Sequence, residues 1–114
     1  MDYDLTSEQA LIRDTVRAFA RERVAPVAEE LDRESRFPYA LVAEMAELGL
    51  MGIPIPAEHG GGGGDTLSYA IAVEELTCVD SSVAITVAAH TSLGTMPIFL
   101  FGDVEQKERW LPDL

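Results

Sequence analysis

Basic side chains are scarce in this chain. Eight lysines and arginines stand against 20 aspartates and glutamates, which gives a formal net charge of −12 at pH 7. A nucleic-acid-binding domain needs a basic face, and anionic membrane surfaces also attract basic proteins, so the charge argues against both partners. Most of the basic residues lie before residue 40. We interpret them as a solvated face on the first helix, with a contact to a protein partner as the alternative.

Cysteine is nearly absent, and no targeting segment is recognisable. Cys78 is the only cysteine, so an intramolecular disulfide cannot form and a zinc site would lack thiolate partners. The segment Met1–Gln9 contains neither a basic leader nor an apolar run of the kind found in signal or transit peptides. We therefore expect a cytoplasmic protein.

Formal charge is missing from one long stretch, the 22 residues Ser81–Gly102. This length is close to what a membrane-spanning helix needs. However, hydroxyl side chains, a histidine and a proline are spread along the stretch, and such polarity would be costly among lipid tails. We therefore interpret it as a helix buried inside a bundle and expect no membrane insertion.

The first helix has a clear start and a proline near its middle. The chain has 114 residues, 47% of them apolar, which is enough for one domain with its own core. Thr6 followed by Gln9 forms a capping box that predicts a helix start. One apolar face then consists of Ile12, Val16, Phe19, Val24, Val27, Ala28 and Leu31. Because this phase continues past Pro26, we predict one kinked helix over about residues 7–34.

A second helix is predicted to begin at Pro38 and to end at Gly49. Proline suits a first helical turn, and glycine suits the left-handed position that ends a helix, with Leu50 making the accompanying apolar contact. The predicted buried face consists of Leu41, Val42, Met45 and Leu48. The segment Met51–Ile55 has strand propensity, but its prolines reduce it to an extended connection.

The second half of the chain predicts further helices. Asp65 caps one over about residues 66–79, with Leu67, Ala70, Ile71 and Leu76 facing inward. Asp80 or Ser81 caps the next, whose run at residues 83–89 is apolar on nearly all sides, so we expect it to be central and covered on every side. Gly94 and Pro97 should break or bend the chain before a short helix through Ile98–Phe101. Asp103 and Gln106 form a capping box for a last helix over about residues 104–110. The predicted fold class is an all-α bundle of five or six helices.

Residues that could carry chemistry are present but do not form a complete active site. The run Gly60–Gly64 lacks a following Gly-Lys-Ser/Thr, so it is no phosphate-binding loop, and we interpret it as a flexible connector. Glu74 and Glu75 point about 100° apart on a helix, which favours structural roles. Neither of the two histidines has metal-ligand spacing or a triad partner, and His90 is predicted to be hydrogen-bonded in the core or at a pocket edge. We therefore assign no catalytic residue and no metal.

The chain resembles the N-terminal domain of the flavin-dependent acyl-CoA dehydrogenases along its whole length. The motifs that carry the resemblance are Leu48-Gly49-Leu50-Met51-Gly52-Ile53, Pro56-x-Glu58-x-Gly60-Gly61, Gly64-Asp65, Tyr69, Val73-Glu74-Glu75-Leu76, Val79-Asp80-Ser81-Ser82, His90-x-Ser92-Leu93 and Phe101-Gly102-x-x-x-Gln106-Lys107-x-x-Trp110-Leu111-Pro112. Their ordered spacing together is specific. The chain departs from the family pattern at His59, where a tyrosine is usual, and in its longer glycine run.

The resemblance implies an FAD-dependent enzyme of fatty acid metabolism. In such an enzyme a glutamate removes the α-proton of an acyl-CoA thioester while the β-hydride passes to flavin N5. The middle β-domain that holds the flavin and the C-terminal helical domain that supplies the glutamate are expected to be absent from these 114 residues. We therefore expect this chain alone to be inactive and to hold no FAD, and the complete enzyme to be a homo-oligomer. A related flavin oxidase or monooxygenase, or a helical interaction module without catalysis, is the alternative.

The resemblance also implies that this domain forms one wall of the acyl-chain pocket. By position in the family pattern, the wall consists of Ile85, Thr86, Ala89 and Leu93. The spacing agrees, because positions 85, 89 and 93 follow one another at steps of four on one helical face, with Thr86 beside them. Plain packing in the core of the domain is the alternative.

Overall fold

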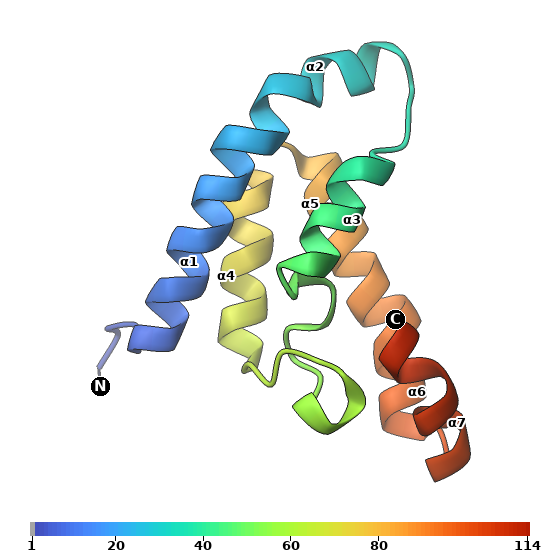
Figure 1. Cartoon of the computed structure of the whole chain (residues 1–114). Helices are drawn as coiled ribbons and strands as arrows, with labels where there is room; N and C mark the ends of the chain where they lie inside the picture. Colours follow the sequence, from blue (N-terminus) through green and yellow to red (C-terminus); the bar gives the residue numbers. More distant parts are fainter. Residues whose placement is uncertain (1) are drawn as a thin grey trace.

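The first helix is a single rod in the computed structural model, which describes residues 2–114 (Figure 1). It consists of α1 (Ser7–Phe19), the π-helical turn η1 (Ala20–Val24) and α2 (Ala25–Arg33), with no non-helical break between them. The capping box at its start is present, since the Thr6 side chain accepts from the backbone N–H of Gln9. The prediction of one helix across Pro26 is therefore confirmed.

The π-helical turn explains how a proline fits inside this rod. Pro26 has no backbone N–H, and its ring would collide with the carbonyl of an ordinary α-helical turn. In the structure, the N–H of Ala25 bonds to the carbonyl of Ala20, five residues earlier. This wider turn lies directly before the proline, and the ribbon changes direction between α1 and α2 (Figure 1).

Helix α3 (Tyr39–Glu47) ends as predicted, but one residue of its buried face is wrong. Gly49 has a φ of 78°, the left-handed conformation that glycine adopts without strain, and Leu50 is buried behind it. Leu41 and Met45 are buried, and Val42 packs against the core. Leu48 is exposed instead of buried, because it follows the last helical turn, where the chain leaves the core face to reach Gly49.

The segment Met51–Ile55 is not extended, and the glycine run is not a loose connector. The chain forms a 3-10 turn, η2 (Leu50–Gly52), followed by a tight turn and a second 3-10 turn, η3 (Ala57–His59). The glycine run lies back along this segment. Its backbone N–H groups donate from Gly62 to the Gly52 carbonyl at 2.8 Å and from Gly64 to the Ile53 carbonyl at 2.7 Å. The predictions of an extended segment and of a flexible connector were both wrong, because local propensity does not describe hydrogen bonds between the backbones of two segments.

Helix α4 (Thr66–Thr77) is capped by Asp65, whose carboxylate accepts from the Ser68 N–H at 2.7 Å. Its buried face consists of Ser68, Ile71, Ala72 and Leu76. Leu67 and Ala70 were predicted to face inward, but both are exposed. The helix contacts both α1 and α5, and small side chains at Ser68 and Ala72 let those neighbours approach closely.

The second long rod runs from Ser81 to Phe101 without a break. It consists of α5 (Ser81–Ala89), the π-helical turn η4 (His90–Thr95) and α6 (Met96–Phe101). Asp80, and not Ser81, is its cap, since it accepts from the Ser82 N–H at 2.7 Å. The predicted short helix is present as α6 and ends at Gly102, but no break separates it from the rest of the rod. A π-helical turn again precedes a proline, Pro97, and accommodates it inside the rod.

The chain ends in α7 (Val104–Trp110) and the 3-10 turn η5 (Leu111–Asp113), and the capping box of Asp103 and Gln106 is present. In Figure 1, α4 lies between α1 and α5, while α6 and α7 extend away at one end. The described residues contain helices and no strands. The all-α prediction is therefore confirmed.

Candidate functional site

An apolar face of the rod from Ser81 to Phe101 is open to solvent. Ile85 is 65% exposed and Leu93 is 77% exposed, and Ala89 lies between them, half-buried. We call these three residues the outward line. Val83, Ala84 and Val87 of the same helix are buried, so the prediction that this helix is covered on every side was wrong. The helix has one covered face and one open apolar face.

Thr86 lies beside the outward line and is half-buried. Its hydroxyl donates to the carbonyl of Ser82 at 2.9 Å, within the same helix. The donor of Thr86 is thereby used, so the side chain offers its methyl group and an acceptor to the surroundings. The structure brings all four predicted wall residues to adjoining positions on one helix, and core packing within this chain does not account for Ile85 and Leu93. Their contact with an acyl chain stays a prediction.

Sequence reasoning missed two further exposed apolar residues of this rod. Leu100 is 58% exposed and Phe101 is 87% exposed, at the far end of the same rod. Both belong to the uncharged stretch Ser81–Gly102, and this lack of charge is the signal that could have found them. By length and composition alone, Ser81–Phe101 could cross a membrane, and only 28% of its most apolar window is buried inside the domain. The rod is thus less buried than predicted.

The histidines do not form a catalytic group with other described residues. His90 is half-buried, and its Nε2 lies 3.0 Å from the carbonyl oxygen of Leu114, so the predicted hydrogen bond is present. The ring of His59 lies edge-on to Phe99, with 6.0 Å between ring centroids. Within residues 2–114 no three His, Cys, Asp or Glu side chains are placed to hold a metal ion.

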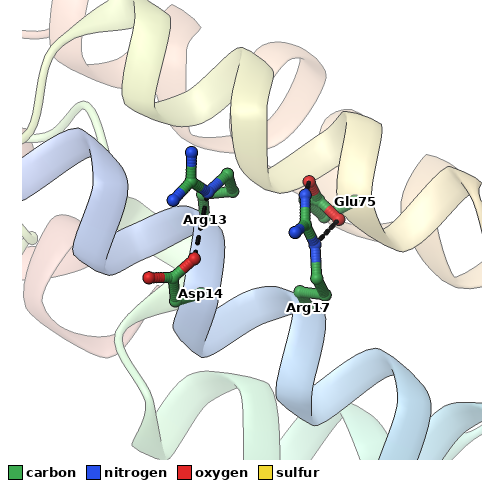
Figure 2. A network of polar contacts seen from close by, with 4 residues as sticks. All are labelled: Arg13, Asp14, Arg17 and Glu75. Carbon is green, nitrogen blue, oxygen red and sulfur yellow. Dashed lines mark hydrogen bonds and ion pairs between the residues drawn. The ribbon is translucent and has the colours of Figure 1, made fainter. Parts of the chain in front are cut away.

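Glu75 joins two helices (Figure 2). Its carboxylate accepts two hydrogen bonds from the Arg17 guanidinium, at 2.7 Å from Nη2 and 3.0 Å from Nε. These hydrogen bonds lower the pKa of Glu75 below its usual range. Arg23 likewise binds Glu44 of α3 at 2.7 Å. The interpretation of the basic residues as a merely solvated face was therefore incomplete, since two of them bind acidic partners on neighbouring helices.

We expect Glu75→Gln to lower the unfolding midpoint at pH 7. The folded-state pKa is depressed, so the stabilisation is present above the unfolded-state pKa of about 4.3 and is lost as the pH falls through the folded-state value. The effect should be modest, because Arg17 is 42% exposed and water screens the pair. Thermal unfolding of both proteins at pH 7 and under acidic conditions measures it.

Glu74→Gln is the matched control, because Glu74 is exposed and makes no ion pair within the described part of the chain. Its unfolding midpoint should follow that of the parent protein at both pH values. An equal loss of stability in the two variants at neutral pH would contradict the role given to the Arg17–Glu75 pair.

The fold and this surface define a helical domain with a large open apolar face. The chain belongs to the acyl-CoA dehydrogenase family, because residues 6–114 match the family described as acyl-CoA dehydrogenase, N-terminal domain. A probable acyl-CoA dehydrogenase of Bacillus subtilis is 47% identical over 114 residues, which is 100% of this chain and 30% of that protein.

Solved structures give the same relationship. Butyryl-CoA dehydrogenase of Megasphaera elsdenii is 39% identical, with a TM-score of 0.92 over 98% of this chain and 30% of that one. An acyl-CoA dehydrogenase of Bacillus anthracis, solved in complex with FAD, is 37% identical, with a TM-score of 0.86 over 96% of this chain and 19% of that one. The chain thus spans about 30% of the length of the first two relatives.

Proposed function

We propose that this chain is the N-terminal domain of a flavin-dependent acyl-CoA dehydrogenase and that the outward line, with Thr86, forms one wall of its acyl-chain pocket. The observation that carries the proposal is the open face itself. Ile85 and Leu93 are large apolar side chains left 65% and 77% exposed, although the domain has a closed core elsewhere. Exposed apolar faces of this kind mark binding surfaces.

The chemistry of the face suits an alkyl chain. Its side chains are aliphatic and carry no charge, and the helix places them about 6 Å apart along its axis. Burial against such a surface is non-directional and contributes about 0.8 kcal/mol for each methylene removed from water. A wall of this type selects acyl groups by length and width. In the complete protein, we propose that the remaining domains and the acyl chain cover this face, and that lipid does not.

The hydroxyl groups of the rod that carries the outward line are poorly placed to bind a flavin dinucleotide. The hydroxyls along the rod donate to nearby backbone carbonyls, as Thr86 does to Ser82 and Ser92 does to Ala88 at 2.6 Å. These two hydroxyl donors are therefore not free for phosphate or isoalloxazine oxygens. We propose that FAD is held by the remaining domains and that this chain contributes no catalytic residue. A homo-oligomeric enzyme in the cytoplasm completes the proposal.

Turnover by the complete protein tests the function. We expect reduction of an artificial electron acceptor with acyl-CoA substrates of several lengths. Hydrogen peroxide formed without the acceptor would indicate a related oxidase, and a requirement for a reduced cofactor together with oxygen would indicate a monooxygenase. A complete protein without flavin and without turnover would contradict the proposal and leave an interaction module.

We expect the 114-residue chain alone to be colourless and inactive toward acyl-CoAs. The reason is that the proposal assigns FAD and the catalytic base to the remaining domains. Absorbance spectra of the purified chain after incubation with FAD measure the outcome. Flavin bound at one equivalent would overturn this expectation.

A further inference from the structure

The helix that carries the outward line has a second stripe with the same spacing on its buried side. This buried stripe consists of Val83, Val87, Thr91 and Thr95, each at most 2% exposed. In a regular α-helix a step of four residues overshoots a full turn by about 40°, so such stripes should drift around the axis. Both stripes instead stay on the same side of the helix along the rod. The helix therefore has more residues per turn here than an α-helix.

The π-helical turn η4 is the cause. The N–H of Met96 bonds to the carbonyl of Thr91, five residues earlier, and this bonding pattern winds each residue through a smaller angle than an α-helix does. The overshoot that accumulates between Ile85 and Ala89 is thereby reduced between Ala89 and Leu93. Leu93 keeps its place in the outward line because of this turn.

Two buried hydroxyls hold the turn. Thr95 Oγ1 donates to the carbonyl of His90 at 3.2 Å, five residues back, which spans the π-helical turn from within. Thr91 Oγ1 donates to the carbonyl of Met51 at 3.1 Å, which ties the same turn to η2. Hydroxyls this deeply buried need their partners, since an unpaired polar group in the core is costly. The first bond keeps the turn wide, and the second fixes its rotation against the domain.

We infer that Thr91 and Thr95 are positioning residues for the acyl-chain wall. They lie on the face of the helix opposite to Leu93 and touch no substrate. Through the π-helical turn, they set the rotational position of the Leu93 side chain about the helix axis relative to Ile85. This position determines the length of the acyl chain that the wall fits. This inference rests on the proposed function.

Thr91→Val and Thr95→Val in the complete enzyme test it, because valine keeps the branched shape and removes the donor. The measurement is kcat/KM over a series of acyl-CoAs of increasing length, together with the unfolding midpoint. We expect the ratio of long to short substrates to change by about fourfold for each methylene that loses contact with Leu93. Thr91→Ser and Thr95→Ser, which keep the hydroxyl, should keep the parent ratio.

Thr77→Val is the matched control. The hydroxyl of Thr77 also donates to a helix carbonyl, that of Val73 at 2.6 Å, but it lies exposed on α4. Its substrate ratio should equal that of the parent enzyme. If Thr91→Val fails to fold, Thr95→Val alone tests the inference, since the hydrogen bond that it removes lies within the helix. Valine variants that unfold earlier but keep the parent ratio overturn the inference. A parent enzyme that does not turn over acyl-CoA contradicts the proposed function. A parent enzyme that does turn it over, with valine variants that keep the parent ratio, contradicts only the inference about Thr91 and Thr95.

Discussion

Replacing Ala89 by phenylalanine in the complete enzyme is expected to shift its preference toward shorter acyl chains by about 15-fold. Ala89 has the smallest side chain of the outward line and lies between the exposed Ile85 and Leu93. A ring at this position would fill space that we assign to substrate methylenes. Excluding two of them forfeits roughly 1.6 kcal/mol of burial, which is about 15-fold in kcat/KM for the longer substrate. Relative kcat/KM for short and long acyl-CoAs measures the shift.

Two alanines provide matched controls for this substitution. Ala84 is buried in the core, so Ala84→Phe should cost about 1–3 kcal/mol of stability through overpacking and leave the preference unchanged. Ala70 is exposed on α4, so Ala70→Phe should change neither quantity. An Ala89→Phe enzyme that behaves like Ala84→Phe, with lower stability and the parent preference, would remove the outward line from the substrate site.

Gly61→Ala is expected to destabilise the protein by about 3 kcal/mol, the upper end of what overpacking costs. A Cβ at Gly61 would overlap the carbonyl oxygen of Ile55 and lie 2.5 Å from its Cβ. The neighbour is backbone and cannot move aside, because the next glycines are hydrogen-bonded to the same segment. Urea unfolding of parent and variant gives the free-energy difference.

Gly94→Ala is the control, because a Cβ there meets nothing within 4 Å. Gly94 lies inside a helix, where alanine is more favourable than glycine by roughly 0.5–1 kcal/mol. The two substitutions should therefore change the free energy of unfolding in opposite directions. If Gly61→Ala changes stability by less than about 0.5 kcal/mol, as is usual for a surface substitution, the glycine run is the flexible connector that the sequence indicated.

Signals that act over a few residues predicted the fold well. The pairs Thr6 with Gln9 and Asp103 with Gln106 mark two helix starts, and both capping boxes are present. Gly49 marks a helix end through its left-handed conformation. These features depend only on residues three or four positions apart, so the sequence contains all the information that they need.

Features that depend on a distant partner could not be predicted. The prediction that Leu67 and Ala70 of α4 face inward was wrong, because the packing of α1 and α5 against that helix selects its buried face. The glycine run was misread, since its hydrogen-bond partners on the segment from Gly52 to Ile55 form no recognisable pattern.

The candidate site lies between these cases. A step of four residues and the family resemblance predicted the positions of the outward line. The prediction assumed an ordinary helix followed by a break or bend at Gly94 and Pro97, whereas the rod continues through a π-helical turn. Proline was read as a breaker because its clash is local, while the wide turn that accommodates it depends on the buried contacts of Thr91 and Thr95.

A crystal structure of the complete protein with a non-reacting acyl-CoA analogue tests the central claim most directly. We expect carbon atoms of the acyl chain within about 4.5 Å of Ile85, Ala89 and Leu93, the distance at which apolar groups are in contact. An outward line covered instead by side chains of another domain, with the acyl chain elsewhere, would contradict the account.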